Sequence, residues 1–172
     1  MALELFLNLI SEGSYLAVFL SSFVIASTVM IPIIPVPSYV PIILGVGIGM
    51  NPLLVGLVGG VGSALGELIA YFVGFGGTAA IEKFEHHIPK FLKRFEKFYS
   101  NIGFNVILVC AFIPFPFDLI GILSGASQYD VKKFFAALLI GRTLRSLLLA
   151  YTGVYIIQFG SDALNFMLHI FG

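Results

Sequence analysis

The sequence predicts an all-α integral membrane protein. We expect an inverted repeat of two re-entrant helical hairpins, each followed by a transmembrane helix, with an interfacial amphipathic segment between the halves. Three observations lead there: a long uncharged apolar run, proline-rich breaks inside apolar stretches, and the return of the same parts in the second half of the chain. Of the 172 residues, 59% are hydrophobic and 10% are charged. Soluble domains carry about 25% charged residues, so the composition argues against one.

The uncharged run extends from Gly13 to Gly66 and contains no Asp, Glu, Lys or Arg. About 20 apolar residues suffice for one crossing, so the run is long enough for more than one passage. The length of the chain allows a single membrane domain over 1–172. The N-terminus lacks the basic stretch of a signal peptide, so we expect the first segment to stay in the mature protein.

The first hairpin is predicted over 15–49. An apolar helix is interrupted between residues 32 and 37 by three prolines, which lack an amide hydrogen for the helix. The arm that follows, 39–49, spans only about 16 Å as a helix, whereas the hydrocarbon core is about 30 Å thick. It cannot cross alone, so we predict a re-entrant turn at Pro35 and Pro37. Irregular backbone at that depth must be buried in protein or line an aqueous cavity, which makes the turn a candidate site.

A crossing helix is predicted over 52–75, because Asn51 and Pro52 supply a cap and a first-turn proline. It completes a first half over 13–77. The next segment, 78–100, combines charged residues with apolar residues near helical spacing, which is typical of an amphipathic element on the membrane surface. A plain hydrophilic linker is the alternative.

Small residues follow one another along this crossing helix at spacings of three and four. Such spacing predicts close helix packing, and the residues are Gly56, Gly59, Gly60, Gly62, Ser63 and Gly66.

The second half, over 102–159, repeats the order of parts. We predict a re-entrant hairpin over 102–126, a crossing helix over 131–158, and a short interfacial tail over 161–172. One constant shift in residue number places Pro35 on Pro114, Pro37 on Pro116, Gly62 on Gly141 and Glu67 on Ser146. A single crossing helix between two re-entrant hairpins would invert the second half, as in many transporters.

Basic residues gather on one side of this topology, in the segment 78–100 and the turn 127–133. They are Lys83, Lys90, Lys93, Arg94, Lys97, Lys132 and Lys133. The positive-inside rule therefore places both loops in the cytoplasm, and both termini outside, for a multi-pass protein of the cell membrane. A model in which every apolar segment crosses would scatter these charges less cleanly.

Three ionisable residues fall inside the predicted crossing helices: Glu67 in the first, and Arg142 and Arg145 in the second. Charges at this depth are costly and are by default functional hypotheses. The two arginines are three residues apart, so they share a helix face and can hold one anion from two sides. The alternative is an ion pair with Glu67 that only locks the two halves together.

Ser38 and Asp118 fall at the two proline turns, where capping of the returning arm would by itself explain both. The functional interpretation adds them to Arg142 and Arg145 as a site for a phosphate headgroup, because helix N-termini also favour anions. The lipid tail would stay in the bilayer. Glu67 and Asp118 are the candidates for exchanging a proton.

Enzyme motifs are missing from the sequence. It contains no nucleotide-binding loop, serine-hydrolase motif, metalloprotease motif or cysteine cluster. We therefore expect no enzymatic activity, no cofactor and no metal site. The formal net charge of zero argues against a nucleic acid partner, and a homodimer is compatible with the sequence.

Several motifs together resemble a known family. They are Pro35-Val36-Pro37-Ser38, Gly62 to Glu67 with Tyr71 and Gly74, Ile113-Pro114 with Ser124-Gly125, and Phe134 before Gly141. Over roughly 21–155 the chain is similar to the DedA superfamily, also called VTT or SNARE-associated membrane proteins. Pro116-Phe117-Asp118 and the segment Gly141 to Arg145 resemble its smaller YqaA-like branch. In the better-studied branch an acid stands at the position of Tyr39, and arginines stand near Ala111 and near Phe117 or Asp118.

The resemblance implies two facing re-entrant hairpins and a role in moving lipids across the bilayer. This includes recycling of polyprenyl phosphate carriers, and proton coupling is suggested for some members. We therefore predict a transporter or scramblase for a phosphate-bearing lipid, either a polyprenyl phosphate carrier or a phospholipid. The alternatives are a proton- or ion-coupled exporter of small solutes and a structural membrane protein that transports nothing.

Overall fold

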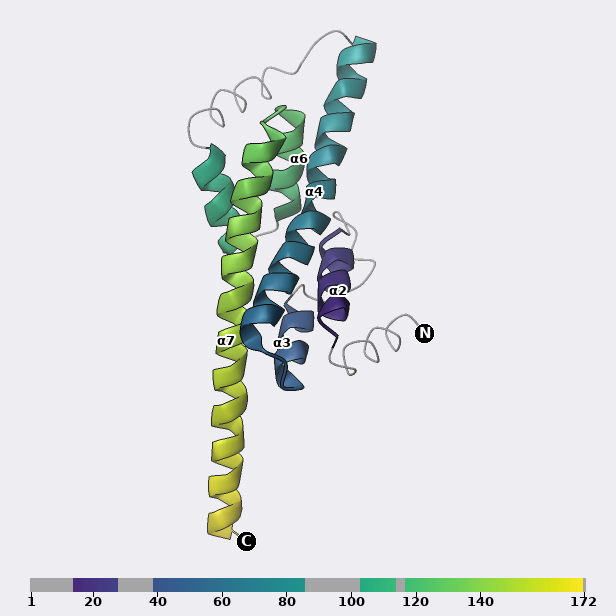
Figure 1. Cartoon of the computed structure of the whole chain (residues 1–172). Helices are drawn as coiled ribbons and strands as arrows, with labels where there is room; N and C mark the ends of the chain where they lie inside the picture. The colour runs from purple at the N-terminus through teal and green to yellow at the C-terminus, as the bar shows by residue number, and fades with distance from the viewer. Residues whose placement is uncertain (1–13, 28–38, 86–102, 114–116, 172) are drawn as a thin grey trace.

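A computed structural model describes residues 14–27, 39–85, 103–113 and 117–171 of the chain (Figure 1). All regular structure in these ranges is helical, as the sequence predicts. The helices are α2 (Tyr15–Ser27), α3 (Val40–Gly47), α4 (Pro52–Glu85), Gly103–Phe112, α6 (Phe117–Ala126) and α7 (Val131–Phe171). Five predicted site residues lie outside the described ranges: Ser38, Pro35, Pro37, Pro114 and Pro116.

Two helices are long and apolar enough to cross a bilayer. The apolar part of α4 is Pro52–Gly77, with 26 residues, and that of α7 is Val131–Gly160, with 30 residues. At the helical rise these correspond to about 39 and 45 Å, more than the hydrocarbon core of about 30 Å. Both begin where the sequence predicts crossing helices, which were expected over 52–75 and 131–158.

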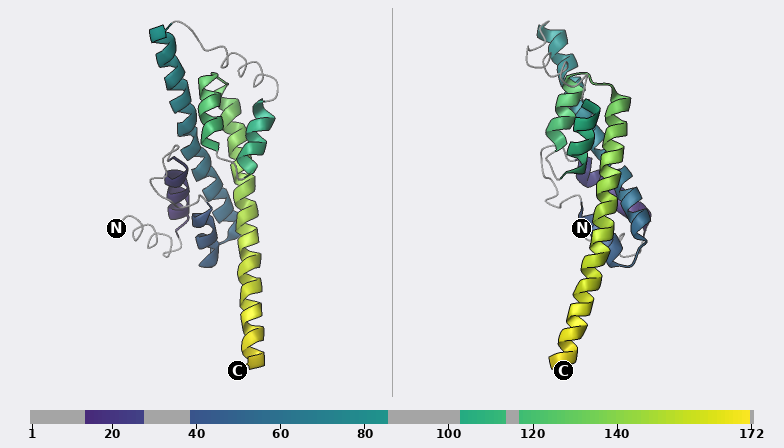
Figure 2. Two further views of the ribbon diagram at one scale, coloured as in Figure 1. Left: turned by 180° about the vertical axis from the view of Figure 1, so that it is seen from behind. Right: turned by 90° about the vertical axis from the view of Figure 1, so that its left-hand side faces the viewer.

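The long helices differ from the prediction at their ends. Helix α4 continues to Glu85, into the segment 78–100 that the sequence marks as a separate interfacial element. Helix α7 continues to Phe171 and passes beyond α3, where a separate tail over 161–172 is expected (Figures 1 and 2). The physical reason is that glycine in a helix costs only about 1 kcal/mol relative to alanine, so glycines without a proline do not end a helix.

The turns before α4 and α7 are built alike. Each contains the two backbone hydrogen bonds of a Schellman motif. In this motif the amides of two consecutive residues beyond the helix donate to carbonyl oxygens in the last turn of the helix. The bonds run from Gly49 to Val46, Met50 to Gly45, Gln128 to Gly125 and Tyr129 to Ser124, at 2.9 to 3.1 Å. Gly49 and Gln128 have positive φ angles of 84° and 53°.

Each turn also ends on a side chain that caps the next helix. Asn51 Oδ1 accepts a hydrogen bond from the Leu53 amide at 2.9 Å, and Asp130 Oδ1 accepts one from the Lys133 amide at 2.8 Å. The two Schellman turns, both caps and both starts of the long helices are related by the same shift that places Pro35 on Pro114. That shift therefore relates the same local structure in the two halves.

In the first half, α2 runs parallel to α4 and α3 returns antiparallel to it (Figure 1). The contacts that set these directions pair Phe19 with Gly62, Phe23 with Gly66, Ile42 with Gly59 and Gly45 with Val55. With 13 and 8 residues, α2 and α3 are about 20 and 12 Å long, so they lie beside only part of α4.

In the second half, helix Gly103–Phe112 packs on α7 and α6 packs on α4, while α7 runs antiparallel to α4 (Figure 2). The contacts pair Gly56 with Leu147, Gly60 with Thr143, Gly74 with Ile122 and Gly141 with Leu108. The predicted role of the small residues in close packing is confirmed, because a Cβ atom at Gly60 would lie 2.6 Å from the Cα atom of Thr143.

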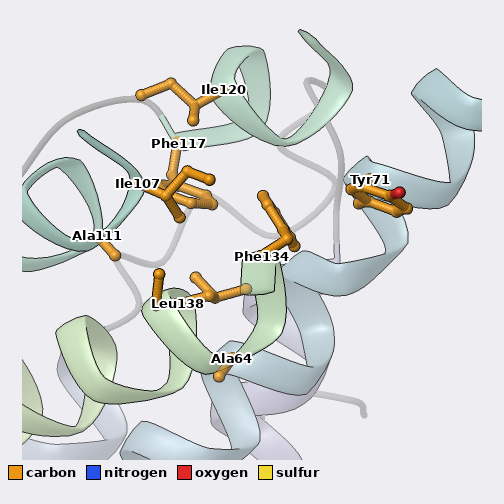
Figure 3. Packing of buried hydrophobic residues seen from close by; sticks show 9 residues of the cluster. Ala64, Tyr71, Ile107, Ala111, Phe117, Ile120, Phe134 and Leu138 are labelled. Atoms are coloured by element: carbon orange, nitrogen blue, oxygen red, sulfur yellow. The ribbon is translucent and has the colours of Figure 1, made fainter. Parts of the chain in front are cut away.

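Buried hydrophobic side chains form one cluster in each half. The cluster of the second half gathers around Phe134 and Phe117, with side chains from α4, α6, α7 and helix Gly103–Phe112 (Figure 3). The cluster of the first half contains Val18, Ile42, Val46, Met50, Val55 and Ala150. Val55 and Phe134 are both fully buried and stand at equivalent positions of the two long helices.

The substitution Gly60→Ala should lower the stability of the protein by about 1 to 3 kcal/mol, because the added methyl group overlaps the backbone of α7. The measurement is thermal unfolding in detergent. The matched control is Gly160→Ala on α7, where nothing lies within 4 Å of the added atom and stability should stay equal or rise slightly. Equal losses in both variants would contradict the close packing of α4 on α7.

Candidate functional site

A buried ion pair joins α4 to α7. Arg142 Nε donates a hydrogen bond of 2.8 Å to Glu67 Oε2, and Arg142 Nη2 contacts Glu67 Oε1. The guanidinium thus holds both carboxylate oxygens, which is the strongest geometry for such a pair. The two side chains are only 6% and 8% exposed, so water screens the pair little.

The sequence leaves two roles open for these charges, binding of an anion or an ion pair between the halves. The structure contains the ion pair. Removing one member of a buried pair leaves the other charged and unpaired, which costs several kcal/mol. Glu67 and Arg142 therefore set how α4 and α7 face each other. Two nitrogen atoms of Arg142, Nε and Nη2, are directed to Glu67. Binding of a phosphate by Arg142 stays a prediction.

Phe117 covers the guanidinium of Arg142. The ring centroid lies 5.4 Å from Arg142 Cζ, which is within the range of a cation–π contact. Phe117 is the first residue of α6 and is 2% exposed, and its ring also packs 6.1 Å from that of Phe134. Three helices, α4, α6 and α7, therefore meet at one charge.

Sequence reasoning missed this contact of Phe117. The one signal available was its position directly after Pro116, in a motif already singled out by the family resemblance.

Helices α2 and α6 both come close to the ion pair. The backbone nitrogen of Ser27, the last described residue of α2, lies 3.0 Å from where a Cβ atom of Gly66 would stand, next to Glu67. On α6, the ring of Phe117 lies over Arg142.

Arg145 differs from Arg142, because no counter-charge lies beside it among the described residues. It is half-buried, and over the described ranges it forms no hydrogen bond and no ion pair. It stands midway along the apolar span of α7, which runs from Val131 to Gly160. Its neighbours Leu144 and Leu148 are among the exposed large hydrophobic residues. Within the described segments, an arginine without a counter-charge therefore lies midway along an apolar span, beside exposed apolar side chains.

Asp118 lies in the first turn of α6 and is partly buried. A carboxylate there is stabilised by the positive end of the helix dipole, which agrees with the capping interpretation. The structure therefore brings Glu67 and Arg142 together, places Arg145 nearby on α7, and leaves Asp118 at the start of α6.

A tyrosine fixes the turn before α7 onto α4. The hydroxyl of Tyr71 donates a hydrogen bond to the carbonyl oxygen of Tyr129, and the Tyr71 ring packs 4.9 Å from that of Phe134. Burial, and after it the charge of Asp130, raise the pKa of the Tyr129 phenol above its usual value, so this side chain stays neutral at physiological pH. Tyr71 and Tyr129 thus hold the turn before α7 against α4.

No cluster of three or more His, Cys, Asp or Glu side chains that could hold a metal ion is found within the described segments. Cys110 is a free, partly buried cysteine.

Comparison with known families gives one match. The model of the VTT domain matches residues 34–155, a range that contains all of α3, α4 and α6, and α7 up to Tyr155. Glu67, Asp118, Arg142 and Arg145 all lie within it. No curated protein and no solved structure matches the chain.

The ion pair predicts a specific pattern of stability. Glu67→Gln should lower the free energy of unfolding by about 3 to 5 kcal/mol, because Arg142 is left buried without its partner. The double variant Glu67→Gln with Arg142→Gln should recover a large part of that loss, since neither buried charge remains. Unfolding in detergent, analysed as a double-mutant cycle, measures the coupling. Additive losses in the cycle would show that the two residues are energetically independent.

Proposed function

Because this chain belongs to the VTT-domain family, the DedA family of membrane proteins, we propose that it moves a phosphate-bearing lipid across the bilayer. The family is membrane-associated and linked to membrane transport. The observation that carries the proposal is Arg145, a half-buried cation at the middle of an apolar span, without a counter-charge in the part of the chain that the structure describes.

The chemistry of Arg145 favours a phosphate. An unpaired arginine at the centre of a membrane helix costs about 2.5 to 3.5 kcal/mol on insertion scales, and an anionic ligand would offset this cost. The planar guanidinium matches the oxygens of a phosphate, with which it forms paired hydrogen bonds. A lipid in transit brings a phosphate to this depth while its tail remains against Leu144 and Leu148. Both a polyprenyl phosphate carrier and a phospholipid satisfy this requirement.

The proposed topology is that of the sequence analysis. The length of α3, 8 residues between the described residues Tyr39 and Ile48, supports a first hairpin that enters the membrane and returns, since α3 cannot span about 30 Å as a helix. The repeated turns at 48–51 and 127–130, on opposite ends of the antiparallel pair α4 and α7, support an inverted second half. We place the basic loops 78–100 and 127–133 in the cytoplasm.

Proton coupling is part of the proposal. Glu67 exchanges a proton only when its pair with Arg142 opens, whereas Asp118 lies partly buried in the first turn of α6. Enzymatic activity, a cofactor and a nucleic acid partner form no part of the proposed function. The second candidate is a structural membrane protein, and the observation that favours it is the Glu67–Arg142 pair, which links α4 to α7.

Reconstitution into liposomes tests the proposal. With labelled polyprenyl phosphate or labelled phospholipid, the wild-type protein should give flux above empty liposomes, and Arg145→Gln should lower that flux about tenfold or more, because the anion loses its charged contact. The matched control is Lys132→Gln, which removes one positive charge from an exposed site at the start of the same helix. Flux equal to that of empty liposomes would overturn lipid transport, and equal flux in all three proteins would overturn the role of Arg145.

The topology has its own test. In a Cys110→Ser background, single cysteines at Asn51 and Gln128 should be labelled by a membrane-impermeant maleimide from opposite sides, because the two turns lie at opposite ends of the α4–α7 pair. Labelling of both from the same side would refute the inverted arrangement of the two hairpins.

A further inference from the structure

The returning arms of the two hairpins, α3 and α6, occupy equivalent places and are held very differently. Helix α6 contacts α4 backbone to backbone. A Cβ atom at Gly74 would collide with the carbonyl oxygen of Ile122 and lie 2.7 Å from its carbonyl carbon. From the other side, a Cβ atom at Gly121 would lie 2.8 Å from that of Ala70, and one at Gly125 would lie 2.8 Å from the amide nitrogen of Phe75. Helices this close have little freedom to separate without losing many contacts.

Helix α3 contacts α7 through side chains at the equivalent place. Gly153 of α7 is the equivalent of Gly74, yet the nearest atom to a Cβ at Gly153 would be a γ-carbon of Val46, at an ordinary distance of 4.0 Å. A Cβ at Gly47 of α3 would likewise lie 3.9 Å from the δ-carbon of Ile157. No backbone atom of α3 comes within 4 Å of the Cβ position at Gly153. The contact between α3 and α7 is therefore the looser of the two.

The residues that face the long helices explain the difference. Where α6 presents Gly121 and Gly125, α3 presents Ile42 and Val46 at the equivalent positions. Val46 stands between α3 and Gly153 of α7, while Ile42 packs on Gly59 of α4. Elsewhere the halves pack alike. A Cβ at Gly62 would collide with the carbonyl oxygen of Phe19, and one at the equivalent Gly141 would lie 2.7 Å from that of Leu108. The looseness thus belongs to α3 and not to the whole first half.

The turns at the ends of the two arms differ in the helix that they bind and in the residue at the positive φ position. The turn after α6 is tied to α4 by the hydrogen bond from Tyr71 to the carbonyl of Tyr129, and Gln128 holds its positive φ position. The turn after α3 is tied to α2 by a hydrogen bond of 3.3 Å from the Asn51 amide to the Tyr15 hydroxyl, and its positive φ position is Gly49, which has no atom within 4 Å of a Cβ position. Glycine permits more backbone conformations than any other residue, so this turn is the better hinge.

We propose that α3, pivoting on the turn at Gly49, is the moving gate of this protein and opens along its contact with α7, while α6 stays fixed on α4. The proposal rests on the proposed transport function and adds which of the two hairpins moves. Arg145 stands on α7, so the opening of this contact would widen access to the same helix that carries the unpaired cation. Loose, side-chain-mediated helix contacts are the ones that slide during hinge and shear motions.

Reversible cross-links test which contact must open. In a Cys110→Ser background, Val46→Cys with Gly153→Cys joins α3 to α7 by a disulfide, and Phe72→Cys with Leu119→Cys, at exposed positions of α4 and α6, is joined by a cleavable bis-methanethiosulfonate reagent. Oxidation of the first pair should lower lipid flux about tenfold or more, with recovery on reduction, because a closed gate stops the rate-limiting motion. Joining the second pair should change flux by less than about twofold. Full flux with α3 locked, or lost flux only with α6 locked, would overturn the proposal.

Spin labels at exposed positions provide a second measurement that does not depend on transport. Labels at Ile48 and Ile156 report the distance from the end of α3 to α7, and labels at Phe72 and Leu119 report the distance from α4 to α6. The first pair should show two distances whose populations change when polyprenyl phosphate or phospholipid is added, and the second pair a single distance. Two distances in the second pair and one in the first would refute the gate. If the wild-type protein shows no flux, the proposed function fails, and the spin labels still decide which arm moves.

Discussion

The buried pair of Glu67 and Arg142 is the interaction on which the arrangement of this protein depends. Both side chains are nearly inaccessible, so each would be strongly unfavourable without the other. Their meeting therefore fixes the rotation and register of α4 against α7. The glycines of α4 make the meeting sterically feasible, because backbone contact at Gly56 and Gly60 brings the helices close enough for a direct bidentate pair.

The same pair organises the electrostatics around it. Glu67 neutralises one arginine and leaves the other with its full charge, so the three residues together carry one net positive charge near the middle of the apolar spans. Phe117 shields the paired guanidinium from the rest of the bundle. Arg142 is paired, whereas Arg145, three residues further along, has no counter-charge among the described residues.

The two halves have the same order of helices and turns, but their returning arms, α3 and α6, differ in how closely they pack on α7 and α4. Their turns match hydrogen bond for hydrogen bond, and their long helices begin at equivalent positions. The substitution of Ile42 and Val46 for Gly121 and Gly125 is enough to change one arm from a backbone contact to a side-chain contact. A repeat with unequal arms has one rigid and one loose side.

The sequence by itself determined the apolar character, the all-α class, the starts of both long helices and the constant shift that relates the halves. These features rest on composition and on turn chemistry within about five residues, which is local. It also marked Glu67, Arg142 and Arg145 as important, because charges in apolar spans are rare. The continuation of α4 and α7 past residues 75 and 158 was beyond it, since glycines alone do not end a helix.

Only the tertiary structure decided which arginine pairs with Glu67, that Phe117 covers it, and which hairpin arm lies loosely. Helical periodicity places Arg142 and Arg145 on one face of α7, but it does not determine how α7 is rotated relative to α4. That rotation is set by contacts between residues far apart in the chain, such as Gly60 with Thr143 and Glu67 with Arg142. Such contacts depend on how whole helices fit together, and local sequence patterns do not specify that fit.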